Sequence, residues 1–339
     1  MRKIQIIIFV LCVFLYNIVI IPQNEKYNFY SMAKKIKTIY LSEKLLIGDI
    51  TTLDVNSERN LLVVDKIGNS VYLFNSKGAL LKNLSIEKCN PGINWRPFEA
   101  KFDKNGNILI LNSNPWGFRF DSNGNCIGRL DLSFIAPLHT AFLRSGEMVG
   151  YYNIIPNVNY LLILDKYGKE KIKFGKFPKE YQKLIYRLEG GGLITDDNDN
   201  IYQINVSRPD IFKYDKTGKF IKSFKNVPSH YRKIEKDLSS YDPLQSLKEL
   251  PKLLIDKTIP IDLFLLAPDK IMVQLVHNKN YIIQIFNVDG DYLLKAEIIV
   301  DRKVICAKDG LIYFISQPKP DKKGKLPNPI IEIYKLKSI

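Results

Sequence analysis

The sequence has little of several residue types on which common site chemistries depend. Of 339 residues, four are cysteine, three are histidine and two are tryptophan. Four cysteines are too few for a disulfide-stapled scaffold, and three histidines are too few for a histidine-rich metal enzyme. Acidic residues are fewer than basic ones, 35 against 50, which gives a formal net charge of +15. Because 46% of the residues are hydrophobic and 25% are charged, wholesale disorder is excluded.

The chain also lacks the short motifs that mark common catalytic and nucleotide sites. It has no Gly-x-Ser-x-Gly, Gly-x-Gly-x-x-Gly, phosphate-binding loop or His-Glu-x-x-His. Asp196, Asn198 and Asn200 match the first three ligands of a calcium loop. However, Ile201 replaces the required glycine and no glutamate stands at position twelve, so we predict a hairpin turn there. We therefore assign no catalytic residue, metal or cofactor.

The N-terminus has the features of a targeting segment. Arg2 and Lys3 precede an uncharged run over residues 4–21, as in an export signal. The run is also long enough to span a bilayer. Ser31 and Ala33 are small residues suited to a cleavage site. Residues 1–33 are thus either a cleaved signal peptide or an uncut signal anchor, which would associate with the membrane through residues 4–21. Both alternatives predict that residues 34–339 lie outside the cytoplasm, in the periplasm or at the cell surface.

A turn motif recurs through the rest of the chain. It consists of an aromatic or aliphatic residue, Asp or Asn, two variable residues and Gly. The five copies are Phe74–Gly78, Phe120–Gly124, Leu164–Gly168, Tyr214–Gly218 and Phe286–Gly290. Asp or Asn caps such a turn with its side chain, and Gly supplies the positive φ that closes it. Strand-like runs flank each copy, and a second turn followed by an aliphatic strand lies upstream in every unit.

Each unit therefore contains four strands, here called A to D, and six units fill about 290 residues. Four antiparallel strands at this period predict an all-β fold, a six-bladed β-propeller. The sixth unit ends without a strand D. Residues 36–41 form an unassigned strand before unit one, and we expect that strand to complete blade six and close the ring.

The repeat resembles that of NHL-repeat six-bladed propellers, in particular exported bacterial ones of unknown role. Unit four matches best, through Asp196–Tyr202, Val206–Arg208 and Tyr214–Gly218. Units three and five are degenerate, and unit six keeps little. The resemblance covers residues 36–339 and implies the fold, but it implies no single function, because this fold hosts binders, scaffolds, lyases and lactonases.

Two connections between blades carry helical signals. Residues 225–260 form an insertion between blades four and five. Asp242, Pro243 and Gln245 there predict a helix start, and Pro251 predicts its end. A shorter helix is expected over residues 178–186. Both segments are D-to-A connections and would lie on one face of the ring, as helical caps or as a lid.

Metal and disulfide sites have weak support in the sequence. His139, His230 and His277 come from three different connections, so a zinc site is not predicted. A calcium site like that of propeller lactonases would draw on Glu99, Asn112 and Asn153. Cys89 and Cys126 are expected on opposite faces, too far apart for a disulfide, and Cys306 is expected in the core.

The D-to-A and B-to-C loops lie on the same face and carry arginine and exposed aromatic residues, a composition typical of binding surfaces. The candidate binding residues are Trp95, Arg96, Trp116, Arg187, Arg208 and His277. We expect an extracytoplasmic binding or scaffold module with a protein, peptide or glycan partner and without nucleic acid. The alternative is a metal-dependent hydrolase or lyase that uses the central channel.

Overall fold

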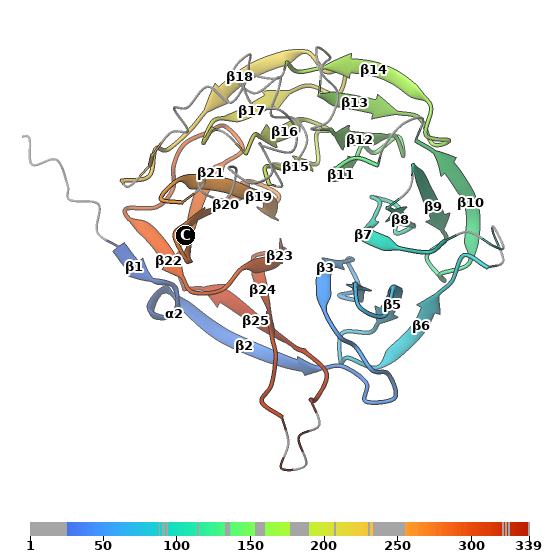
Figure 1. Ribbon diagram of the computed structural model, residues 1–339. Helices are drawn as coiled ribbons and strands as arrows, with labels where there is room; N and C mark the ends of the chain where they lie inside the picture. The colour runs from blue at the N-terminus through green and yellow to red at the C-terminus, as the bar shows by residue number, and fades with distance from the viewer. Residues whose placement is uncertain are drawn as a thin grey trace, which may run out of the picture.

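The computed structural model describes residues 26–337, apart from 88, 90, 91, 93, 114, 133–135, 153–159, 177–189, 207, 230, 233–254, 321, 323 and 325. Its sheets form six blades around one axis, each with four antiparallel strands (Figure 1). Strand A of each blade is innermost and strand D is outermost. The predicted six-bladed β-propeller is therefore confirmed.

The strands follow one another from blade to blade in chain order. Blades one and two contain β3 (Ile50–Val55), β4 (Leu61–Asp65), β5 (Ser70–Phe74), β6 (Leu80–Leu84), β7 (Pro97–Phe102), β8 (Ile108–Asn112), β9 (Trp116–Phe120) and β10 (Cys126–Asp131). Blades three and four contain β11 (His139–Phe142), β12 (Met148–Tyr151), β13 (Leu161–Leu164), β14 (Glu170–Phe174), β15 (Gly192–Thr195), β16 (Ile201–Ile204), β17 (Ile211–Tyr214) and β18 (Phe220–Phe224). Blades five and six contain β19 (Thr258–Ala267), β20 (Lys270–His277), β21 (Asn280–Asn287), β22 (Glu297–Val300), β23 (Val304–Lys308), β24 (Leu311–Ser316), β25 (Ile330–Leu336) and, at the outer edge of blade six, β2 (Ala33–Tyr40).

The apolar core is divided among the interfaces between blades. Strands such as β4 and β8 are buried along their whole length, because a neighbouring blade covers each face. The buried side chains form six clusters, one at each of the six blade interfaces. The ring therefore owes its apolar stabilisation to contacts between blades, and each blade depends on its neighbours.

The repeated turns join strand C to strand D and also touch the preceding blade. In blade four, Asp215 Oδ1 accepts hydrogen bonds from the backbone N–H groups of Thr217 and Lys219, at 2.8 and 3.0 Å. Gly218 has a φ of +78°, and a Cβ there would lie 2.7 Å from the ring of Phe174 at the end of β14. Glycine is thus required both for the turn and for the contact with blade three.

The ring closes as predicted. Strand β2 pairs antiparallel with β25, from Ala33 opposite Leu336 to Tyr40 opposite Ile330. The observed strand starts three residues before the expected 36–41. An early segment of the chain therefore completes the last blade.

Residues 26–32 are also part of the fold, although the sequence analysis assigned them to the targeting segment. Strand β1 (Lys26–Asn28) pairs parallel with β22 of blade five, and helix α2 (Phe29–Met32) follows. The ring of Phe29 is completely buried, with its centroid 5.2 Å from that of Phe314 and 5.5 Å from that of Tyr334. This segment fills the outer part of the interface between blades five and six.

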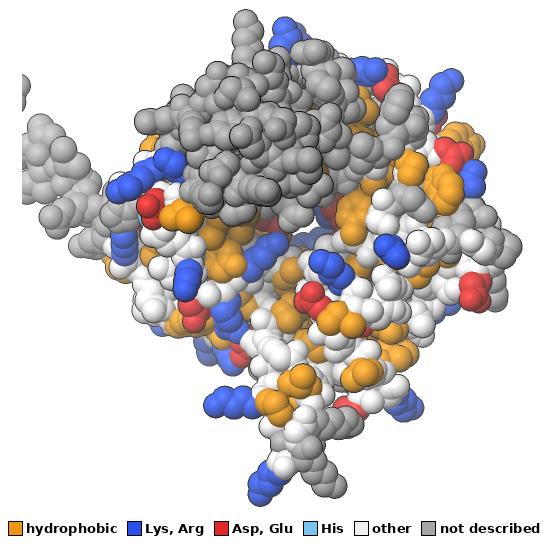
Figure 2. All heavy atoms as spheres, viewed as in Figure 1, with side chains coloured by type: hydrophobic (Ala, Val, Ile, Leu, Met, Phe, Trp, Pro, Cys, Tyr) orange, Lys and Arg blue, Asp and Glu red, His pale blue; other side chains and the backbone are white. Residues whose placement is uncertain are grey.

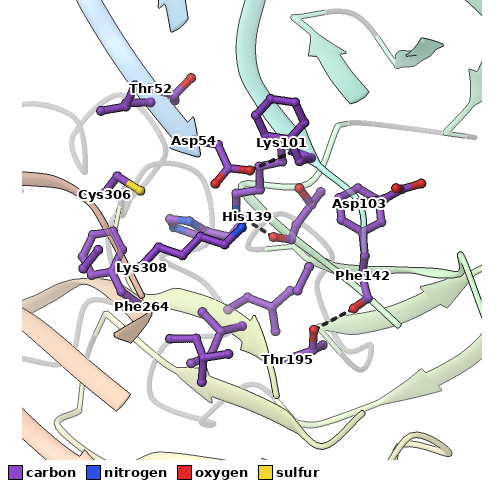
Figure 3. A pocket seen from close by; sticks show the side chains of 18 of the residues that line it. Thr52, Asp54, Lys101, Asp103, His139, Phe142, Thr195, Phe264, Cys306 and Lys308 are labelled. Carbon is purple, nitrogen blue, oxygen red and sulfur yellow. Dashed lines mark hydrogen bonds between the residues drawn. The ribbon is translucent and has the colours of Figure 1, made fainter. Parts of the chain in front are cut away.

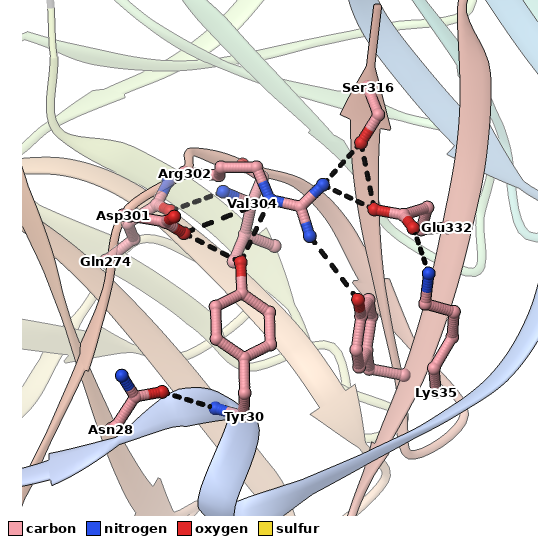
Figure 4. Close-up of polar contacts among 10 residues, drawn as sticks. Asn28, Tyr30, Lys35, Gln274, Asp301, Arg302, Val304, Ser316 and Glu332 are labelled. Atoms are coloured by element: carbon pink, nitrogen blue, oxygen red, sulfur yellow. Dashed lines mark hydrogen bonds and ion pairs between the residues drawn. The ribbon is translucent and has the colours of Figure 1, made fainter. Parts of the chain in front are cut away.

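A polar network holds the same segment in place (Figure 4). The Tyr30 hydroxyl donates to Asp301 at 2.7 Å and accepts from Arg302 Nε at 3.0 Å. Arg302 also pairs with Glu332 of β25, which in turn pairs with Lys35 of β2. The network therefore ties α2, β2 and β25 together across the closure.

One disulfide was wrongly excluded by the sequence analysis. Cys89 and Cys126 are bonded, with their Cα atoms 5.9 Å apart. The exclusion placed Cys89 in the D-to-A connection on one face of the ring and Cys126, at the start of strand D, on the opposite face. The blades twist, however, and the end of β6 packs against the turn at Gly124, where a Cβ would lie 2.6 Å from Leu84. Cys89 follows β6 and Cys126 follows that turn, so the two meet. Cys306 is buried, as expected.

The helices expected over 178–186 and within 225–260 fall in segments outside the described residues. The described part of the chain contains no helix long and apolar enough to cross a membrane.

Candidate functional site

The innermost strands of all six blades surround a central cavity of about 850 Å³. It extends from the start of each strand A, at the face that bears the D-to-A connections, to the A-to-B turns at the other face. Basic side chains gather around the centre of the ring (Figure 2). The cavity is the principal candidate for a ligand site, because it is concave and carries several ionisable groups.

The strand register sorts the cavity side chains into two rings. The mouth ring, nearer the D-to-A connections, contains Thr52, Glu99, His139 and Asp262, together with Lys303 directly before β23. The middle ring contains Asp54, Lys101, Ala141, Ile194, Phe264 and Cys306. It lies two residues further along β3, β7, β11 and β19, and three residues further in blade six, where β23 has a bulge between Val304 and Cys306. Alternate residues of a strand share a face, which explains the spacing of two.

The middle ring is polar on one side and apolar on the other. Cys306, Asp54 and Lys101 come from blades six, one and two, which are neighbours in the ring. Ala141, Ile194 and Phe264 come from blades three, four and five, which are also neighbours. Figure 3 shows Asp54, Lys101, Cys306 and Phe264 around the same space. A molecule in this channel would meet a charged wall and a hydrophobic wall.

Glu99 and Lys101 form an internal pair within the channel. Lys101 Nζ lies 3.0 Å from Glu99 Oε1 and donates to the Thr140 carbonyl at 2.6 Å. The Thr140 hydroxyl donates to the other oxygen of Glu99 at 2.8 Å. Burial opposes ionisation of Lys101, but the attraction of nearby carboxylates outweighs it and raises the lysine pKa. Lys101 is therefore charged, and both side chains find their polar partners within the protein.

For His139 and Asp262, nearby charges do not offset the effect of burial on the charged form. Burial, together with the positive charges of Lys101 and Lys303, lowers the pKa of His139 to about 3, so its imidazole is neutral near pH 7. Burial raises the pKa of Asp262 to about 6, although the same two lysines oppose that rise. Perturbed groups of this kind occur at functional sites more often than elsewhere.

The other polar groups of the channel differ in whether they form hydrogen bonds within the protein. Asp54 accepts hydrogen bonds from the N–H groups of Val55 and Phe102, both at 2.8 Å. Lys308 donates to the Val55 carbonyl at 2.6 Å. By contrast, the buried hydroxyls of Thr51 and Thr52 make no hydrogen bond with a described residue.

The predicted binding residues that the structure describes are scattered over the face that bears the D-to-A connections. Trp95 and Trp116 are half-buried against the core between blades one and two, where Trp95 lies 5.8 Å from the Phe118 ring centroid. Trp116 is covered by Arg129. Arg96, next to Trp95, is exposed.

The remaining predicted residues belong to other blades. Arg208 pairs with Asp210 at 2.9 Å in blade four, and His277 Nδ1 lies 3.0 Å from the Thr258 hydroxyl in blade five. Arg187 lies outside the described residues.

The metal candidates are not brought together in the described part of the chain. His139 is a strand residue of the channel rather than part of a connection, which corrects its predicted position. Asn112 is used structurally, because its side chain bonds the backbone of Asn94 and Arg96. His230 and Asn153 lie outside the described residues. No group of three His, Cys, Asp or Glu side chains suited to a metal occurs among those described.

The calcium-loop mimic is a hairpin turn, as predicted. Asp196 Oδ1 accepts hydrogen bonds from the N–H groups of Asn198 and Asn200, at 2.8 and 2.9 Å. Its other carboxylate oxygen accepts from Asn200 Nδ2 and from the Tyr202 hydroxyl. The carboxylate therefore caps the turn from A to B.

Sequence reasoning missed Lys101, Asp262 and Lys303 as channel residues. The available signal was the alternation of polar residues in two inner strands, Thr52-x-Asp54 and Glu99-x-Lys101. Strands with one face on a polar channel show this pattern.

Comparisons with known proteins identify the fold and no family. No protein-family model matches the chain, and no curated protein sequence is similar to it. A solved structure of a Bacteroides fragilis protein that is named as an exported protein superposes with a TM-score of 0.68 at 13% identity, over 92% of this chain and 99% of that one. A member of the DUF4221 family from Bacteroides vulgatus gives 0.65 at 13% identity, over 91% and 98%. The virginiamycin B lyase of Staphylococcus aureus gives 0.50 at 13% identity, over 85% and 80%.

Proposed function

We propose that the protein is an extracytoplasmic binding propeller that holds its ligand in the channel mouth, on the face of the D-to-A and B-to-C connections. The two-sided lining of the channel carries this proposal. One wall offers charges and the other offers apolar side chains, so the cavity suits a small molecule or a chain end that has both characters.

Export has three lines of support. The apolar run over residues 4–21 follows two basic residues. The Cys89–Cys126 disulfide is a bond that persists in oxidising compartments. A protein of the same fold is named as exported. We propose that residues upstream of Lys26 direct export, as a cleaved signal or as a membrane anchor.

The NHL-like character of the repeat also remains a proposal. Its support is unit four, the best match, in which Arg208 pairs with Asp210 and so braces the B-to-C connection. Trp95, Arg96, Trp116, Arg208 and His277 would then form the outer surface around the channel mouth and contact a protein, peptide or glycan partner.

A channel lyase or hydrolase is the second candidate. The raised pKa of Asp262 favours it, because groups that titrate near their working pH serve as general acids and bases. The metal-dependent form of this candidate has less support, since the described residues offer no three-ligand group.

A plugged-channel variant tests the binding proposal. The protein is screened by thermal shift against amino acids, short peptides and oligosaccharides, and each hit is measured by calorimetry. Phe264→Arg places a long charged side chain in the middle ring and should abolish binding. Ile127→Arg, on the exposed outer strand β10, is the control and should bind as the native protein does. Hits that bind Phe264→Arg equally well would show that the ligand does not use the channel.

A further inference from the structure

We propose that the channel ligand is a zwitterion with an apolar body, of the class of an apolar amino acid or a short apolar peptide. This inference rests on the proposed binding function and specifies its ligand. It follows from which groups in the channel are already satisfied within the protein and which are left for a ligand.

The unsatisfied cationic group is Lys303. Among the described residues, Lys303 forms no ion pair or hydrogen bond, and its side chain is exposed at the channel. In the mouth ring, Lys303 of blade six is next to Thr52 of blade one, whose buried hydroxyl has no hydrogen-bond partner among the described residues. An exposed ammonium group at the mouth of a cavity is suited to binding a carboxylate.

The unsatisfied anionic group is Asp262 of blade five. Its Oδ1 accepts the N–H of Leu263 at 2.9 Å, whereas Oδ2 accepts no hydrogen bond from a described residue. Glu99 and Asp54, the other channel carboxylates, are occupied by Lys101, Thr140 and backbone N–H groups. Asp262 is thus the carboxylate available to an ammonium group of a ligand.

The apolar wall lies deeper in the channel than Asp262, in the middle ring. Phe264 follows two residues later on the same strand, and Ile194 and Ala141 continue the wall across blades four and three. An ammonium held by Asp262 and a carboxylate held by Lys303 would direct an apolar side chain towards this wall. The cavity of about 850 Å³ is large enough for a short peptide.

Calorimetry with matched ligands tests the assignment on the mature protein. The probe is the dipeptide Leu-Phe, compared with its N-acetylated form, its C-terminal amide and the dipeptide Gly-Gly. We expect Leu-Phe to bind roughly 10- to 100-fold more tightly than either blocked form. Gly-Gly, which lacks the apolar body, should also bind more weakly.

Two variants assign each end of the ligand. Asp262→Asn should lose the preference for a free ammonium but keep the preference for a free carboxylate, and Lys303→Gln should do the reverse. Lys319→Gln, an exposed lysine of the same face, is the control and should keep both preferences.

The pH dependence of Leu-Phe binding gives an independent test of the role of Asp262. Among the described residues, Lys303, Lys101, Glu99 and Cys306 interact electrostatically with Asp262, and His139 belongs to the same ring of the channel. Since His139 stays neutral between pH 7.5 and 5, binding of Leu-Phe should weaken over that range as Asp262 is protonated. Asp262→Asn should remove the dependence.

Three results would overturn the inference: no binding of Leu-Phe, equal binding of the blocked forms, or unchanged preferences in both variants. If ligands of another class still bind in a manner sensitive to Phe264→Arg, the channel function stands and only the ligand class is wrong. If nothing in the screen depends on Phe264, both proposals fail.

Discussion

At the scale of single residues, Asp262 is held where ionisation costs free energy. Burial outweighs the attraction of Lys303 and Lys101, which raises its pKa from 3.8 to about 6. The folded protein therefore binds this proton more tightly than the unfolded chain does. The resulting instability is complete above about pH 6 and disappears below about pH 4. A carboxylate kept at such a cost is typical of a functional site.

Asp262→Asn should accordingly stabilise the protein at pH 7.5, by about 2 kcal/mol. The gain should vanish by about pH 3, where the native carboxyl is protonated in both the folded and the unfolded protein. Urea unfolding at the two pH values measures the difference. Asp131→Asn, at an exposed position, should change the free energy of unfolding by less than about 0.5 kcal/mol. A loss of stability in Asp262→Asn at pH 7.5 would show that the carboxylate is stabilised after all.

At the scale of elements, closure of the ring depends on two short segments at its outer edge. Glu332 of β25 joins them, because it pairs with Lys35 of β2 and with Arg302 and accepts from the Ser316 hydroxyl at 2.8 Å. Burial opposes its ionisation, but these partners prevail and lower its pKa from 4.5 to about 2. This contribution is present above about pH 4.5 and is lost as the pH falls towards 2.

Glu332→Gln should therefore lower the free energy of unfolding by about 2–3 kcal/mol at pH 7. The difference from the native protein should shrink steadily between pH 4.5 and 2. Denaturation curves across this range test it. Glu170→Gln, whose partner Lys173 is a surface residue, is the comparison and should have little effect at any pH. A difference that does not vary with pH would mean that packing, not charge, accounts for the loss.

Substitution of Phe29 tests whether helix α2 belongs to the folded unit. Its completely buried ring packs among Phe314, Tyr334 and the aliphatic residues between blades five and six. Phe29→Ala should destabilise the protein by about 3–5 kcal/mol. Tyr40→Ala, at the exposed end of β2, should cost far less. If the N-terminal segment is cleaved, the same argument places the cut upstream of Lys26, which N-terminal sequencing of the mature protein would check. Cleavage after Ala33 with full stability would contradict both statements.

At the scale of the whole molecule, the sequence predicted connectivity better than three-dimensional contact. The Asp/Asn-x-x-Gly motif reflects a local conformational requirement, namely a capped turn with positive φ at Gly218 and at the equivalent glycines. Because this requirement is local, the number of blades and the closing strand could be predicted from the sequence. The Cys89–Cys126 contact depends on blade twist, which residue spacing does not encode. His139 was misplaced because β11 begins at that residue, directly after a segment that reads as a connection. Asp262 was missed because strand β19 begins within the segment read as an insertion.

The disulfide links the fold to the compartment and yields the last prediction. It connects residues 37 apart in the sequence, and closing such a loop contributes about 3–4 kcal/mol by restricting the unfolded chain. Protein exported to an oxidising compartment should therefore be more stable by that amount than Cys89→Ser/Cys126→Ser made there. The same chain without residues 1–25, made in a reducing cytosol, should match the double variant.

Thiol titration of unfolded protein, with Cys306 as the internal standard of a free thiol, reports the bond directly. Equal stability and equal thiol content in both compartments would remove the structural argument for export, and the apolar run over residues 4–21 would have to stand alone.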